Sequence, residues 1–133
     1  MDGSGTFDAL MPRQIASRAE DAGVSKAHTQ AFPMLLLAIL AGAFISLGAV
    51  FSTVTSAGLS GDVPYGIVRL LAGLTFSLGL ILVVVAGAEL FTGNNLLIIA
   101  YASKKVTALQ VLRNWVIVYV GNFLGAIITA AGM

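Results

Sequence analysis

A long apolar stretch lies between Arg69 and Lys104, and Glu89 is its single charged side chain. As one straight helix, this stretch would be about 50 Å long at 1.5 Å per residue, whereas the hydrocarbon core of a bilayer is about 30 Å thick. Two complete crossings would need about 40 residues and a turn between them. The stretch is too long for one simple transmembrane helix and too short for two. We therefore predict one crossing that is broken inside the membrane.

The composition predicts an integral membrane protein. Of its 133 residues, 58% are hydrophobic and 10% are charged, and the mean hydropathy is +0.96. In soluble domains about a quarter of the residues are charged. Seven basic and six acidic residues give a net charge of +1 without a basic patch of the kind that binds nucleic acid, and cysteine is absent. These features predict an all-α membrane protein with no disulfide and no nucleic-acid partner.

Three transmembrane segments are expected after an N-terminal tail. Their approximate bounds follow from the apolar runs: 32–56, 67–102 with a break near 80–92, and 108–131. Small residues at a spacing of four in the first and third segments allow close helix packing, although such motifs specify no partner. These residues are Ala38, Gly42, Ser46, Gly121 and Gly125.

The tail, residues 1–31, carries apolar residues at helical spacing from Met11 to Ala22. Pro12 suits a first helical turn, and Gly23 suits a C-terminal stop. We expect a short amphipathic helix that lies on the membrane or on the protein's own underside. A partly ordered, solvated tail is the alternative.

Basic residues indicate the orientation. They occur in the tail and around the loop before the third segment, whereas the connector 57–66 has none. By the positive-inside rule, the N-terminus and the second loop are expected in the cytoplasm and the connector outside. The basic residues concerned are Arg13, Arg18, Lys26, Lys104, Lys105 and Arg113.

The polar stretch 87-GAELFTGNN-95 lies inside the broken segment. Irregular backbone at membrane depth needs hydrogen-bonding partners. No basic residue is near Glu89 in the sequence, so its carboxylate is expected to accept hydrogen bonds from backbone or hydroxyl groups and to anchor the loop. A proton relay is the alternative role for an ionisable group in a membrane.

Thr92, Gly93 and Asn94 are expected to begin a second half-helix, because Thr and Asn are good N-cap residues. The N-terminus of a half-helix near the bilayer midplane carries partial positive charge and free donors, which attract small anions. A simple helix kink is the alternative.

Four apolar side chains lie just before or within this polar stretch. They suit hydrophobic constrictions that control wetting, although packing is the ordinary role of such residues at helical spacing. They are Phe76, Leu80, Leu90 and Phe91. The chain has one histidine, His28, and no metal-ligand set, cofactor motif or nucleophile–base pair. Neither a cofactor nor an enzyme activity is predicted.

Three stretches closely resemble the formate/nitrite transporter family, especially its formate channels: 76-FSLGLILVVVAGAELFTGNN-95, 113-RNWVIVYVGNFLGA-126 and 7-FDALMPRQIASRAEDAGVSKA-27. The resemblance implies an aquaporin-like fold of six membrane segments per protomer, built as two inverted repeats. It further implies a homopentamer in the bacterial cytoplasmic membrane, with one pore in each protomer and an omega-shaped loop that breaks the second segment.

By the same resemblance, Thr92 is the pore hydroxyl near the anion, and Phe76, Leu80, Leu90 and Phe91 form the constrictions around it. Glu89 occupies the family's acidic loop position, and the N-terminal helix acts in gating at the cytoplasmic mouth. Family members carry a pore histidine and a nearby lysine in their second repeat. The present chain resembles the first repeat, and His28 in the tail is not expected to replace that histidine.

We therefore expect the N-terminal half of a channel for small monovalent anions. Formate is the leading substrate, nitrite and hydrosulfide are others, and a proton can accompany the anion. A non-conducting membrane protein of three segments, which binds an assembly partner or is a truncated remnant, is the alternative hypothesis.

Overall fold

The computed structural model describes residues 11–59, 61 and 63–133, so the first ten residues of the predicted tail and two positions of the connector lie outside it. The described residues form six helices and no strand. In order, these are α1 (Pro12–His28), α2 (Ala31–Ala57), α3 (Tyr65–Val85), α4 (Phe91–Asn94), α5 (Leu97–Ala102) and α6 (Ala108–Ala131).

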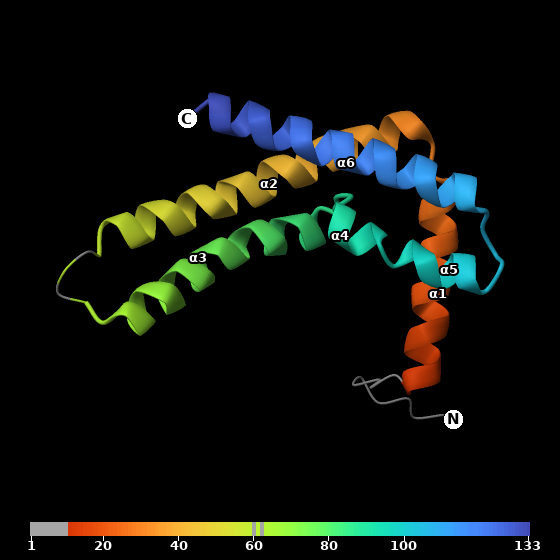
Figure 1. The fold of residues 1–133 in the computed structure, drawn as a ribbon, viewed down its shortest axis with the longest axis horizontal. Helices are drawn as coiled ribbons and strands as arrows, with labels where there is room; N and C mark the ends of the chain where they lie inside the picture. Colours follow the sequence, from red (N-terminus) through yellow and green to blue (C-terminus); the bar gives the residue numbers. More distant parts are fainter. Residues whose placement is uncertain (1–10, 60, 62) are drawn as a thin grey trace, which may run out of the picture.

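Helices α2, α3 and α6 are long and apolar enough to cross a membrane. For the described residues, the prediction of an all-α chain with three candidate membrane-spanning helices is thereby confirmed. Figure 1 shows α2 at the centre, with α3 antiparallel along one side and α6 parallel along another. Helix α1 leaves this group at a steep angle and lies beside α5.

The small residues lie where the long helices meet. A β-carbon at Gly79 of α3 would be 2.7 Å from the Phe44 carbonyl oxygen, and one at Gly48 of α2 would be 2.8 Å from that of Phe76. On the other side of α2, a β-carbon at Gly42 would overlap the backbone of Asn122. A β-carbon would not fit at any of these contacts, so backbone approaches backbone directly.

The GxxxG motif of the third segment has a definite partner in α2. Gly121 faces Ala38, and a β-carbon at Gly125 would overlap the carbonyl oxygen of Ile39. Two predicted small-residue stripes therefore meet each other, which fixes the register of α6 on α2.

Helix α1 is longer than expected, and the predicted stop at Gly23 is wrong. The helix begins with Pro12 in its first turn and continues through Gly23 to His28. Gly23 is buried because α5 lies close: an added β-carbon would be 3.1 Å from the Ala100 β-carbon. Lys105 also pairs with Glu20 at 3.3 Å. The amphipathic helix α1 thus packs against the protein itself, on α5.

The broken segment has three helical pieces. Helix α3 ends at Val85, residues 86–90 leave the helix, and α4 and α5 then continue in the same general direction (Figure 1). The interruption is narrower than the expected 80–92, because Leu80 and the residues up to Val85 remain helical. Gly87 has a φ of 62°, a left-handed conformation that glycine adopts without strain. Helix α3 alone is about 30 Å long at 1.5 Å per residue.

Substitution of Gly125 by alanine should test the α2–α6 contact. We expect the free energy of unfolding to fall by about 2 kcal/mol, because the methyl group would overlap the α2 backbone. Gly73→Ala is the matched control: nothing lies within 4 Å of its added β-carbon, and alanine favours a helix by up to about 1 kcal/mol. Unfolding in detergent micelles, followed by far-UV circular dichroism, measures both. Equal effects of the two substitutions would contradict the close contact.

Candidate functional site

One carboxamide of α6 holds the interruption in the broken segment. The Nδ2 group of Asn122 donates to the carbonyl oxygens of Ala38, at 2.8 Å, and Glu89, at 2.9 Å. Its Oδ1 atom accepts from the backbone N–H of Phe91 at 2.9 Å. The N–H of Glu89 donates in turn to the Leu37 carbonyl of α2 at 3.2 Å. The N–H and carbonyl groups of Glu89 and the N–H of Phe91 are thus bound by the neighbouring helices.

A second carboxamide, Asn94, is completely buried at the end of α4. Its Nδ2 group donates to Oδ1 of Asn114 at 2.9 Å, and its carbonyl accepts from Nε1 of Trp115 at 3.0 Å. Asn114 donates to the carbonyl oxygen of Lys26 at 3.3 Å. This chain of hydrogen bonds connects α4 to α6 and α6 to the tail helix α1.

The Lys26 ammonium lies between the two loop residues for which anchoring was predicted. Its Nζ atom is 2.7 Å from Oε2 of Glu89 and 3.0 Å from Oδ1 of Asn94. The prediction that the Glu89 carboxylate would accept hydrogen bonds from backbone or hydroxyl groups is wrong, because it pairs with the Lys26 ammonium of α1. Only 8% of Glu89 is exposed. Burial of an ionised carboxylate costs folding free energy unless the carboxylate is paired.

A groove of about 540 Å³ opens beside this pair. Helix α3, the interruption, α4 and Lys26 of α1 line it. Five of the seven predicted site residues contribute to the lining: Leu80, Glu89, Leu90, Thr92 and Asn94. Thr92 is exposed there, and the groove is open to the outside of the described chain.

The other two predicted site residues do not line this groove. The ring of Phe91 packs edge-to-face against Tyr119 and Trp115, with ring centroids 5.7 Å and 6.3 Å apart. Phe76 is partly buried on α3, where its carbonyl oxygen faces Gly48. Both residues therefore contribute contacts between helices in this chain.

The predicted N-cap role of Thr92 and Asn94 is also wrong. Helix α4 begins at Phe91, with Leu90 as its N-cap, and it has four residues before a turn leads into α5. A helix this short adds little macrodipole. The N–H groups of Thr92 and Gly93 have no acceptor among residues 11–59, 61 and 63–133, and both residues line the groove.

Sequence reasoning missed Lys26, Asn114, Asn122 and Trp115 as members of this site. A signal was present, because Asn114 and Asn122 are carboxamides in an otherwise apolar helix and must find partners there. For Lys26 no signal existed: the tail and the loop are far apart in sequence.

Asn122→Leu should destabilise the break. Leucine has a similar size but leaves the Phe91 N–H and the Glu89 carbonyl oxygen without partners, which we expect to cost about 3 kcal/mol of unfolding free energy. Asn95→Leu is the control, since Asn95 is exposed and its side chain makes no hydrogen bond within the described residues. Unfolding in micelles measures both variants; a smaller loss for Asn122→Leu than for the control would count against the anchoring role.

Docking of α1 should weaken in acid. Hydrogen bonding to Ser103, supported by Lys105, lowers the pKa of Glu20 from its ordinary value of 4.5, although desolvation opposes this. Because the folded pKa is below the unfolded one, this contribution is complete above about pH 4.5 and disappears as the pH falls through the folded pKa.

Spin labels test this docking, because the chain has no native cysteine. With labels at Ser17→Cys on α1 and Ala102→Cys on α5, the distance distribution should broaden in acid. Adding Glu20→Gln should broaden it already at neutral pH. An unchanged distribution well below pH 4.5 would show that Glu20 does not hold α1 in place.

Comparison with known proteins gives one consistent family. Residues 13–133 match the model of the formate/nitrite transporter family. The formate channel FocA of Escherichia coli (strain K12) is 44% identical over 128 residues, which are 96% of this chain and 45% of FocA. The formate channel BtFdhC of Bacillus thuringiensis is 43% identical over 123 residues, which are 90% of this chain and 46% of BtFdhC.

A more distant relative comes from an organism outside the bacteria. Formate-nitrite transporter 3 of Toxoplasma gondii is 30% identical over 115 residues, which cover 81% of this chain and 23% of that protein. The present chain thus spans about half the length of the formate channels that it matches, or less. The family model covers nearly the whole of this chain, from α1 to the end of α6. The chain therefore belongs to the formate/nitrite transporter family.

Proposed function

We propose that this chain forms one half of a channel for small monovalent anions, with formate as the leading substrate and nitrite or hydrosulfide as others. The observation that carries the proposal is the groove at the break, in a chain whose relatives are formate channels and formate/nitrite transporters. A proton accompanies the anion in one version of this function. The activity belongs to a protomer that is completed by a second half.

The groove has the donors that an anion needs when it leaves water. The Thr92 hydroxyl, the unpartnered N–H groups of Thr92 and Gly93, and the Lys26 ammonium all border it. Glu89 neutralises Lys26 at 2.7 Å, so the groove offers hydrogen bonds without a strong net charge. Conduction requires this balance, because an ion that binds too tightly does not leave.

Apolar residues border the same groove. Leu80 and Leu90 both precede Thr92 in the sequence, and both contribute to the lining. We propose that they narrow the path and exclude water next to Thr92. Constriction by Phe76 and Phe91 remains a prediction from the resemblance.

The open side of the groove indicates that another part of a protein forms its second wall. Polar groups at membrane depth cannot face hydrocarbon, so another part of a protein or a water-filled cavity must cover Thr92 and Glu89. We propose that a second inverted repeat supplies this wall in an aquaporin-like protomer, that the interruption is an omega-type loop, and that completed protomers form a homopentamer.

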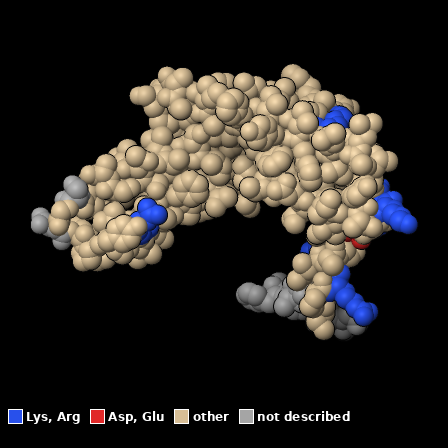
Figure 2. All heavy atoms as spheres, in the orientation of Figure 1, with Lys and Arg blue, Asp and Glu red and all other residues tan. Residues whose placement is uncertain are grey.

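The charge distribution supports an orientation. Most basic side chains visible in Figure 2 lie over the end of the molecule formed by α1, α5 and the start of α6. Figure 2 also shows a basic side chain at the opposite end; α3 begins at that end and contains Arg69 in its first turns. We propose that the richer end and the N-terminus face the cytoplasm and that the membrane is a bacterial inner membrane.

Formate flux into proteoliposomes tests this function. The chain would be measured alone and together with the C-terminal half of FocA as a separate polypeptide. We expect flux only from the combined protein, and we expect Thr92→Val to reduce it about tenfold, because a charged solute loses a hydrogen-bond donor.

Thr53→Val is the matched control, because Thr53 is an exposed residue of α2 outside the groove. Its flux should equal that of the unchanged chain. Absence of formate flux from the combined protein, with both halves co-purifying, would overturn the channel and favour the non-conducting assembly role.

A further inference from the structure

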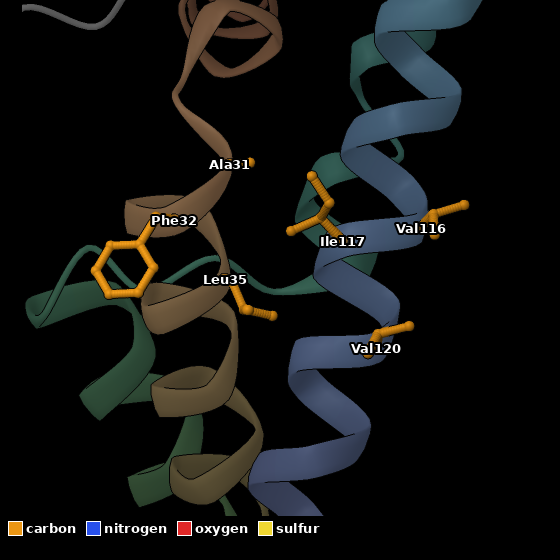
Figure 3. Close-up of a pocket in the computed structure, with 6 residues that line it drawn as sticks. All are labelled: Ala31, Phe32, Leu35, Val116, Ile117 and Val120. Atoms are coloured by element: carbon orange, nitrogen blue, oxygen red, sulfur yellow. The ribbon is translucent and has the colours of Figure 1, made fainter.

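A second groove, separate from the break, lies between the first part of α2 and the first part of α6 (Figure 3). It has a volume of about 450 Å³ and shares no lining residue with the groove at Thr92. Its lining consists of Ala31, Phe32, Leu35, Val116, Ile117 and Val120. Figure 3 shows Leu35 and Ile117 pointing into the space between the two helices. The lining side chains offer no hydrogen-bond donor or charge, so the groove suits a hydrocarbon chain.

A cation lies one helical turn before the lining residue Val116 on α6. Arg113 is on α6, and its Nη2 atom donates to the carbonyl oxygen of Thr29, just before α2, at 3.3 Å. Its side chain is exposed, and among the described parts of the chain no carboxylate lies within 4.0 Å of it. Within the described residues, the guanidinium therefore has free donors and no counter-charge.

The cation and the groove are aligned along both helices. On α6, Val116 and Val120 follow Arg113 by three and seven residues, so the three lie on one face over about 10 Å. On the parallel helix α2, the lining residues likewise follow Thr29. The groove therefore starts beside a positive charge at the end of the helices and runs inward along the membrane-spanning direction.

We propose that this site binds one anionic phospholipid, with the phosphate at Arg113 and one acyl chain in the groove. A phospholipid has the matching shape, because its charge lies at the interface and its chain extends along the bilayer normal. Arginine binds phosphate through several parallel N–H donors. An anionic headgroup also removes the need for another counter-ion at Arg113. A zwitterionic lipid would place the same chain in the groove but would bring no net negative charge to the arginine.

Trp115 gives a direct measurement. It is the only tryptophan of the chain and precedes the lining residue Val116. The purified chain, in detergent, would be titrated with phosphatidylglycerol and phosphatidylcholine that carry the same brominated acyl chains, and quenching of Trp115 fluorescence would be followed. We expect phosphatidylglycerol to bind roughly tenfold more tightly, the effect of one charge-assisted contact. Equal binding of the two lipids overturns the proposal.

Three variants separate a specific site from general attraction. Arg113→Gln should abolish the preference for phosphatidylglycerol, whereas Arg113→Lys should retain part of it. Lys104→Gln removes the same charge from a nearby exposed position outside the groove and should leave the preference unchanged. An equal loss in Lys104→Gln and Arg113→Gln would mean non-specific electrostatics and would overturn the site.

Val120→Phe tests the groove independently of the arginine. The larger ring would occupy space for the acyl chain, so binding of both lipids should weaken severalfold. Unchanged quenching in this variant would show that the chain lies elsewhere, and this result would overturn the proposal even if Arg113→Gln failed to fold. Far-UV circular dichroism of every variant verifies its helix content.

Discussion

The need to bind free backbone groups at the break determines much of this structure. When the chain leaves the helix after Val85, the N–H and carbonyl groups near Glu89 lose their helical partners, and lipid offers none. Asn122 satisfies two of them, the Glu89 carbonyl and the Phe91 N–H, and the Leu37 carbonyl accepts from the Glu89 N–H. In the part of the chain that is described, no buried side-chain nitrogen or oxygen lacks a partner. Without α6 alongside, the interruption could not persist in a membrane.

Close helix packing makes this anchoring possible. A side chain as short as asparagine reaches both the break and the α2 backbone only if α2 and α6 nearly touch. Gly42 removes the atoms that would separate Asn122 from α2, and Gly125 does the same one turn later. The small residues, which bear no chemistry themselves, therefore set the position of the polar loop. The groove at Thr92 depends on packing between helices that do not line it.

Sequence length and composition predicted the all-α membrane class, the three apolar helices and an interrupted second segment, because these follow from hydropathy and the thickness of a bilayer. Other features were not predictable. Thr92 was assigned to a helix cap, yet α4 starts one residue earlier, since the Phe91 N–H is bound by Asn122. The capping preference of Thr92 was therefore outweighed by a hydrogen bond from Phe91 to Asn122, a residue of a distant segment.

Glu89 illustrates the difference between what the sequence determines and what the tertiary structure determines. From the sequence alone, an acidic residue in an apolar stretch had to be paired or hydrogen-bonded, because an isolated charge there is too costly. Its partner, Lys26, comes from a helix that docks on α5 through Gly23 and on the α5–α6 turn through Lys105. Hydropathy and length are properties of consecutive residues, so the sequence determined the class, the segments and the need for a partner. Only the tertiary structure decided which residue met that need, because the pairing depends on the angle at which α1 packs.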